Sequence, residues 1–101
     1  MSKKDYLSQY LLQQKKINRL NCMIKLNPEN RKKYIQAIKK SEGIRREIEA
    51  KISAVDDDVL REILFLKYTC GKSLMEISYI INYSRRHTER LHIKALEKFK
   101  L

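Results

Sequence analysis

The sequence predicts an all-α protein, in which an N-terminal antiparallel helical hairpin is followed by a three-helix unit that contains a helix-turn-helix. Its 101 residues include only two Gly and one Pro, and 35% of them are charged, a composition that argues against a sheet with many turns. Apolar residues recur at helical spacing throughout, which argues against disorder. We place the boundary at a cluster of Asp residues, so that residues 1–55 form the hairpin and residues 56–101 form the helix-turn-helix unit.

The first predicted helix runs from about Lys4 to Leu26. Its apolar residues fall near a heptad seam, and they are Tyr6, Tyr10, Ile17, Leu20 and Ile24. Gln13 or Gln14 interrupts this seam, and a polar residue there can fix the register or the number of partner helices. A glutamine at the edge of the seam is an equally good interpretation.

The second predicted helix runs from about Pro28 to Ala54. We expect Asn27 to cap it, because an Asn side chain can accept from an unpaired N–H, and a Pro is tolerated at the first helical position. Gly43 lies inside this helix, costs about 1 kcal/mol relative to Ala and permits a kink. The apolar stripe consists of Tyr34, Ile35, Ile38, Ile44, Ile48, Ile52 and Val55.

Together the two stripes exceed what one small domain needs to cover. The hairpin is therefore predicted to assemble the chain into a homodimer or a higher homo-oligomer, which would bring two copies of the C-terminal unit together. The residues expected at this interface are Tyr10, Ile17, Leu20, Ile24, Ile38 and Ile48.

The third predicted helix, from about Asp57 to Cys70, follows three consecutive Asp residues. Three carboxylates could suggest a metal site or an acid–base pair, but no further carboxylate or His cluster accompanies them. Capping of the helix N-terminus is the preferred interpretation. The segment is apolar over much of its circumference and is expected to be the most buried helix. Gly71 stands where a left-handed residue would end it.

Two short helices separated by a tight turn are predicted after Gly71. Ser73 stands three residues before Glu76, which is the capping-box pattern, and Ser84 can cap the second helix. Asn82 and Tyr83 would form the turn. The residues expected to face the core are Leu74, Ile77, Ile81, Leu91 and Leu96, with Ser78 at the helix crossing and Tyr83 and Thr88 half-buried.

This arrangement is typical of a helix-turn-helix, whose second helix enters the major groove of DNA. The net charge of +11 points to a polyanionic partner, and double-stranded DNA is the expected one. The residues predicted to read bases are Arg85, Arg86, Glu89 and Arg90. The residues predicted to contact phosphates are Lys72, Ser84, His87, Lys94 and Lys98. The alternative is a plain helical bundle with a basic face.

No pattern for catalysis, a metal or a cofactor is present. His87 and His92 are five residues apart, which does not place them on one helical face, and His92 is expected to pack in the core or at its boundary. Cys22 and Cys70 are predicted to be buried thiols, which indicates a reducing compartment. No signal peptide or membrane span is apparent, so we expect a cytoplasmic protein without a membrane partner.

The C-terminal stretch "GKSLMEISYIINYSRRHTERLHIKALEKF" resembles region four of bacterial sigma factors, which reads the −35 promoter element. The shared pattern is carried by Leu74, Glu76, Ile77, Ser84, Arg85, Lys94, Ala95, Leu96 and Lys98. The resemblance implies that Arg85, Arg86, Glu89 and Arg90 occupy base-reading positions. Arg86 replaces an acidic residue that is usual in primary sigma factors, so the −35 preference is not expected to carry over. The chain has no room for the other sigma regions, and we do not expect a complete sigma factor.

The basic hairpin followed by "YSRRHTERLH" also resembles the small ArpU/RinA-type regulators of phages and prophages of Gram-positive bacteria. That resemblance implies a transcriptional activator of late or packaging genes, located in the cytoplasm of a bacterial host. A rival interpretation is a protein-binding module that engages RNA polymerase or a repressor, with DNA contact secondary. An enzyme acting on nucleic acid is poorly supported, because no paired carboxylates or activated nucleophile are present.

Overall fold

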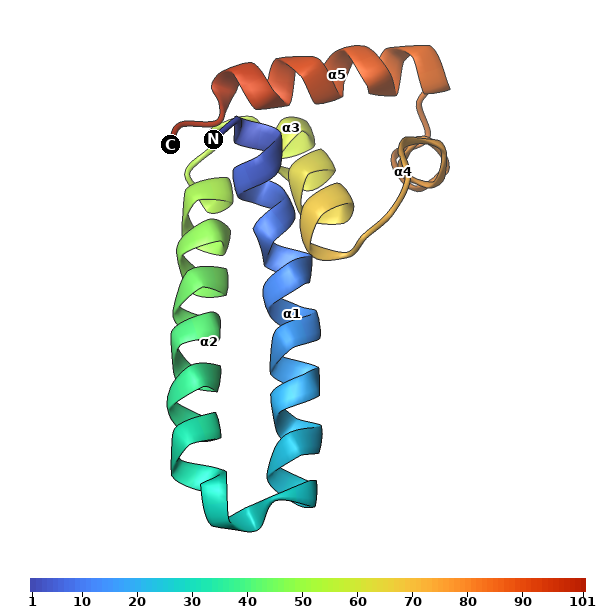
Figure 1. Ribbon diagram of the computed structural model, residues 1–101. Coiled ribbons are helices and arrows are strands. Elements are labelled where there is room, and N and C mark those ends of the chain that lie inside the picture. The colour runs from blue at the N-terminus through green and yellow to red at the C-terminus, as the bar shows by residue number, and fades with distance from the viewer.

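Two long antiparallel helices dominate the computed structural model, which describes residues 1–101 (Figure 1). They are α1 (Lys3–Leu26) and α2 (Arg31–Ser53), joined by a single 3₁₀ turn, η1 (Pro28–Asn30). The rest of the chain forms α3 (Asp58–Leu64), a π-helical turn η2 (Phe65–Thr69), α4 (Leu74–Ile81) and α5 (Arg85–Lys98). No strand is present, so the all-α prediction is confirmed.

The hairpin connection differs from the prediction. Asn27 ends α1, and its backbone N–H donates to the Met23 carbonyl at 2.8 Å, but its side chain caps no helix. Pro28 opens the 3₁₀ turn, and α2 begins three residues later than predicted because that turn intervenes. The α2 helix then continues through Gly43 without a break.

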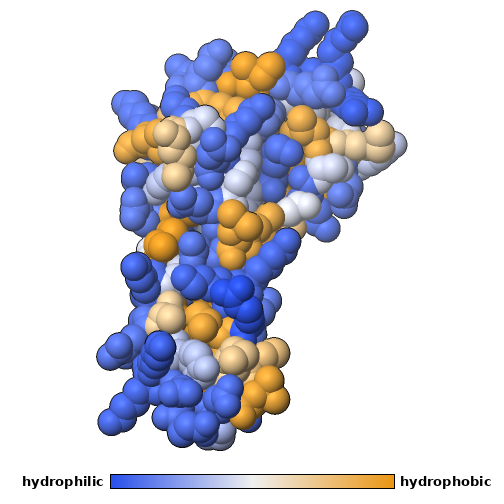
Figure 2. Space-filling model, in the orientation of Figure 1, coloured by the Kyte–Doolittle hydropathy of each residue, from blue (hydrophilic) through white to orange (hydrophobic).

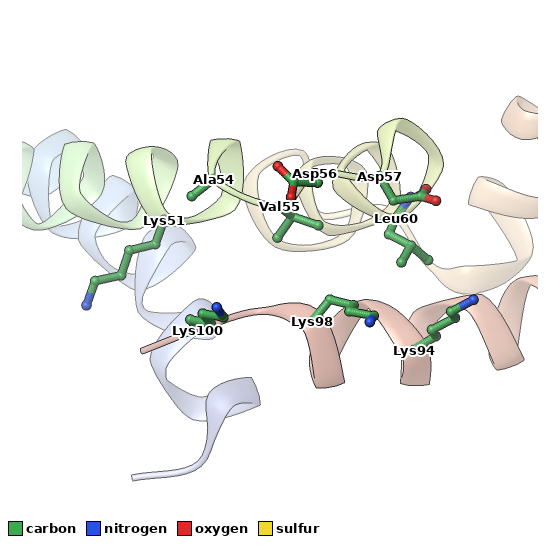
Figure 3. A pocket seen from close by; sticks show the side chains of 9 residues that line it. All are labelled: Lys51, Ala54, Val55, Asp56, Asp57, Leu60, Lys94, Lys98 and Lys100. Carbon is green, nitrogen blue, oxygen red and sulfur yellow. The ribbon is translucent and has the colours of Figure 1, made fainter.

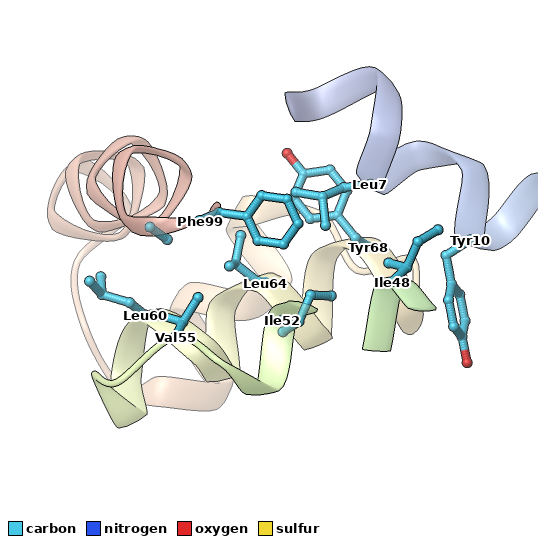
Figure 4. Packing of buried hydrophobic residues seen from close by; sticks show 10 residues of the cluster. Leu7, Tyr10, Ile48, Ile52, Val55, Leu60, Leu64, Tyr68 and Phe99 are labelled. Carbon is cyan, nitrogen blue, oxygen red and sulfur yellow. The ribbon is translucent and has the colours of Figure 1, made fainter. Parts of the chain in front are cut away.

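Both predicted units share one hydrophobic core at the base of the hairpin, by which we mean the end opposite the turn η1 (Figure 4). Leu7 of α1 and Ile52 of α2 are fully buried there with Leu64 and Phe99. The rings of Tyr6 and Phe99 lie 6.1 Å apart, and the Lys3 ammonium donates to the Leu96 carbonyl at 2.8 Å. The two ends of the chain are therefore held against each other, and the Asp cluster does not separate two cores.

Four of the six predicted interface residues are covered within a single chain. Tyr10, Ile17, Leu20 and Ile48 have 0–8% of their surface exposed, so the prediction that they form a subunit interface is wrong. The physical reason is that a hairpin buries the same apolar stripes that two chains would bury. The other two, Ile24 and Ile38, are half-buried and line an open groove of about 630 Å³. Figure 2 shows apolar side chains reaching the surface at the end of the hairpin near η1.

The segment after the hairpin follows the predicted capping but not the predicted single helix. Asp57 caps α3, and its Oδ1 accepts from the Leu60 N–H at 2.9 Å, while Asp58 pairs with Arg61. The last turn widens into η2, where the Thr69 hydroxyl donates to the Phe65 carbonyl at 2.6 Å. Gly71 then adopts the predicted left-handed conformation, with φ of 72°.

Both cysteines are exposed, so the prediction of buried thiols is wrong. Cys22 lies on the side of α1 that faces away from α2, between Arg19 and Lys25 in the helical pattern. Cys70 follows the π-helical turn, where the chain leaves the core. The position of Cys22 opposite the stripe of Ile17 and Leu20 could have identified it as exposed from the sequence.

A buried polar pair connects η2 to α5. The Tyr68 hydroxyl and His92 Nε2 lie 2.8 Å apart, and both residues are about 5% exposed. Burial, with further contributions from Lys67 and Lys4, lowers the pKa of His92 to about 4. Burial also raises the pKa of Tyr68 to about 12. Both groups are therefore neutral at pH 7.

This pair makes the stability of the fold depend on pH. The pKa of His92 is about 4 in the folded chain and about 6.5 when unfolded, so the unfolded state binds more protons between these values. The stabilisation is complete above pH 6.5 and is lost as the pH falls toward 4. We expect a loss of about 3 kcal/mol between pH 6.5 and pH 4 in urea unfolding.

The matched variants are His92→Gln and His87→Gln, because His87 is exposed. His92→Gln should flatten the dependence of the unfolding free energy on pH in this range, whereas His87→Gln should leave it as in the wild type. An equally steep dependence in His92→Gln would contradict this assignment.

Candidate nucleic-acid interface

The turn between α4 and α5 is built as the sequence predicts. Ser73 and Glu76 form a capping box, in which each side chain accepts from the other residue's backbone N–H at 3.1 Å. The hydrogen bond that the Ser73 backbone N–H donates to the Glu76 carboxyl holds the pKa of this group below its usual value. Asn82 ends α4 in a left-handed conformation with φ of 61°. Ser84 caps α5, its hydroxyl accepting from the His87 N–H at 3.1 Å.

One stripe of α5 is buried against the rest of the chain. It consists of Thr88, His92, Ala95 and the following Phe99, all at most 5% exposed. Thr88 was expected to be half-buried but is fully buried, and its hydroxyl is satisfied there by donating to the Ser84 carbonyl at 2.9 Å. Leu91 and Leu96 are only partly buried beside this stripe. The stripe has helical spacing, but Thr, His and Ala conceal it from a search for large apolar residues.

The opposite side of α5, which we call the outer face, carries Arg86, Arg90 and Ile93. Both arginines are exposed, and neither forms an ion pair with another residue of the chain. They lie one turn apart in the first two turns of α5, so both guanidinium groups can reach a base edge in a groove. Ile93 is 59% exposed one turn further on. Sequence reasoning missed it, although its place three residues after Arg90 marks the same face.

The other two predicted base-reading residues lie beside the outer face and bind each other. Arg85 Nε and Glu89 Oε1 are 3.2 Å apart, and both side chains are about half exposed. An exposed ion pair of this kind is worth less than about 1 kcal/mol. A base or phosphate can therefore displace Glu89 from Arg85. Arg86 and Arg90 have no ion pair that must break before they bind DNA.

The predicted phosphate-binding residues are not gathered at one place. Ser84 and His87 lie at the N-terminus of α5, where the ring of Tyr83 meets that of His87 edge-on at 5.0 Å. Lys72 precedes α4, with its ammonium 3.9 Å from Glu76. Ser84 and His87 are thus well placed for a phosphate beside the first turn of α5, which also offers unpaired N–H groups.

Lys94 and Lys98 lie on the C-terminal half of α5, away from that turn. They line a cavity of about 510 Å³ together with Lys51 and Lys100, and its other wall carries Asp56 and Asp57. Figure 3 shows Lys94 and Lys98 on the side of α5 that lies across from the segment with these carboxylates. From Ser84 to Lys98 the helix rises about 21 Å, so a phosphate contacted by Lys98 is a different one from that near Ser84.

The outer side of α4 exposes a second group of side chains, and these are apolar. Met75, Tyr79 and Ile80 are 47–79% exposed. Ile77 and Ser78 of the same helix are buried. These three side chains lie on the part of α4 that the core does not cover.

Two further features of the structure bear on other classes of function. No group of three or more His, Cys, Asp or Glu side chains is placed to hold a metal ion. None of the helices combines the length and the apolar character that crossing a membrane requires.

Comparison of the chain with protein-family models, with curated proteins and with solved structures gave no match.

The cap at Ser84 sets the position of the first turn of α5, so its loss should be measurable. Ser84→Ala removes the acceptor for the His87 N–H and should lower the free energy of unfolding by about 1 kcal/mol. Ser8→Ala is the matched control, because Ser8 is exposed inside α1 and Ala is the better helix former there. Equal stability of Ser84→Ala and the wild type in urea unfolding would show that the cap contributes nothing.

Proposed function

We propose that this chain is a sequence-specific double-stranded DNA-binding protein that regulates transcription, with α5 as the recognition helix. The observation that carries the proposal is the pair Arg86 and Arg90, exposed and without ion pairs on the outer face of the first two turns. An arginine can bind guanine through two parallel hydrogen bonds to O6 and N7, and this is the commonest specific contact in the major groove.

The surroundings of the two arginines support this role. The first turn of α5 offers N–H groups, Ser84 and His87 to one phosphate, while Lys72 lies near the start of α4. Such contacts fix the register of the helix on the duplex but carry no sequence information. Ile93, on the same face, is suited to a thymine methyl group.

The resemblance to sigma region four and to phage regulators supports a more specific proposal, an activator of late or packaging genes in a bacterial host. A homodimer belongs to this proposal, because one chain offers one recognition helix and two copies would read two half-sites. Of the residues expected at the dimer interface, only Ile24 and Ile38 keep accessible surface.

A second candidate function is a protein-binding module that engages RNA polymerase or a repressor. The exposed Met75, Tyr79 and Ile80 of α4 favour it, because an apolar group on a small surface helix often marks a protein contact. Binding of purified protein to DNA without sequence preference, at several salt concentrations, would favour this candidate over the first.

Selection of bound sequences from a random DNA pool, followed by mobility shifts with the selected duplex, tests the role of α5. Arg86→Ala and Arg90→Ala should each reduce discrimination between selected and scrambled duplexes by roughly 10- to 100-fold, which corresponds to about 1–3 kcal/mol per contact. Lys98→Ala is the matched control: it should weaken binding to both duplexes equally and reduce the salt dependence. Unchanged discrimination in the Arg86→Ala, Arg90→Ala double variant would overturn the assignment of α5.

A further inference from the structure

Most of the excess positive charge belongs to the hairpin and not to the helix-turn-helix unit. Residues 1–55 contain 14 Lys and Arg against five Asp and Glu, whereas residues 56–101 contain nine against seven. The hairpin thus has a net charge of +9 and the C-terminal unit of +2. The candidate recognition helix therefore does not account for the basic character of the chain.

Four lysines of α2 concentrate this charge on one side of the helix. We call these residues the lysine patch, and they are Lys32, Lys33, Lys39 and Lys40. Each is three or four residues from Gln36, so the four lysines and Gln36 share one face of the helix. All five are exposed, and the face lies away from the buried Ser41 of the same helix. None of the four lysines is ion-paired.

Few acidic residues lie near the lysine patch to balance its positive charge. From Lys15 to Lys40 the hairpin carries nine Lys and Arg, all exposed, against the single acid Glu29. The one ion pair of the hairpin joins Lys51 to Glu47, near its base. Such a concentration of like charge destabilises an isolated chain, and an anionic partner would remove that cost.

The lysine patch cannot reach a duplex that lies on α5. The N-terminus of α1 contacts α5 through Lys3 and Leu96. The lysine patch lies 13 to 21 residues before the end of α2 at Ser53, which places it about 20–32 Å along the hairpin from that end. Figure 1 shows α5 lying across one end of the hairpin while the hairpin extends to the other side. The outer face of α5 therefore points away from the hairpin, and the two basic surfaces serve different anions.

The chemistry of the patch fits the backbone of duplex DNA. Lysines contact phosphates as point charges without reading sequence. A single strand would need exposed aromatic rings for stacking, but the one tyrosine nearby, Tyr34, is half-buried toward α1. The lysine patch of a second copy carries the same charge, so the two patches repel each other and cannot cover one another.

We propose that the lysine patch binds the phosphate backbone of a second duplex, so that one chain can join two DNA segments. Binding by the patch does not depend on the proposed function of α5. The proposal that one chain joins a DNA site recognised by α5 to a second duplex does rest on the proposed function of α5.

The first experiment places a photo-crosslinker beside the patch. The crosslinker is attached to the thiol that Gln36→Cys introduces, in a chain that also carries Cys22→Ser and Cys70→Ser. The labelled chain is mixed at low salt with a duplex of arbitrary sequence, and we expect crosslinks to the duplex, also when Arg86→Ala and Arg90→Ala are added. Changing all four patch lysines to Gln should reduce them by at least about tenfold, because four phosphate contacts are lost. Changing the four to Arg, which keeps the charge, should preserve them.

A second experiment measures joining directly, with the same chains lacking the crosslinker. A selected duplex on beads should retain a second, labelled duplex of arbitrary sequence through the wild-type protein and through the Lys→Arg variant, but not through the Lys→Gln variant. Binding of the Lys→Gln variant to the first duplex should be largely kept.

Three results would overturn the proposal. One is an unchanged crosslink yield in the Lys→Gln variant. Another is crosslinking to polyglutamate, used as a probe for an acidic protein, with none to DNA. The third is retention of the second duplex by the Lys→Gln variant. Loss of sequence preference alone would instead contradict the proposed function of α5, and it would leave the crosslinks at position 36 in place.

Discussion

The packing of Phe99 against the first turns of α1 is the contact on which the rest of the structure depends. Phe99 is fully buried among Leu7, Leu64 and their neighbours (Figure 4). The centre of its ring lies 6.1 Å from that of Tyr6. This contact joins the last helix of the chain to the first. Because a helix has one buried stripe, fixing Phe99 also fixes the rotation of α5 about its axis. Packing of α5 on α3 and α4 keeps it across the end of the hairpin and not along it (Figure 1).

The geometry of the candidate interface follows from that rotation. With Thr88, His92 and Ala95 turned inward, Arg86 and Arg90 are turned outward, where no carboxylate of the chain meets them. The cap at Ser84 fixes where the helix starts, so both arginines fall within its first two turns. The hairpin is left pointing away from this surface, and its charge is separated from that of α5. One core thus determines that the molecule has two basic surfaces and where they lie.

Local signals in the sequence predicted what depends on local physics. The capping box at Ser73, the cap at Ser84 and the left-handed Gly71 each involve residues a few positions apart, and all three were predicted. The widened turn η2 and the burial of Thr88 depend on packing between distant segments, which periodicity does not encode. An apolar stripe also cannot tell a hairpin partner from a second chain, so Tyr10 and Ile48 were assigned to the wrong contact. The sequence alone shows that the hairpin carries most of the net positive charge. Only the structure shows that this charge lies away from the outer face of α5.

The proposed role of α5 depends on Arg86 and Arg90 reading bases in the major groove. Methylation interference on a selected duplex tests this most directly, because methylation of guanine N7 blocks the major groove while methylation of adenine N3 blocks the minor groove. We expect guanine N7 methylation at one or two positions of each site to prevent binding, and Arg86→Ala to abolish the effect at one of them. Interference by adenine N3 methylation alone, or a guanine pattern unchanged in both arginine variants, would contradict a role for these arginines in base recognition.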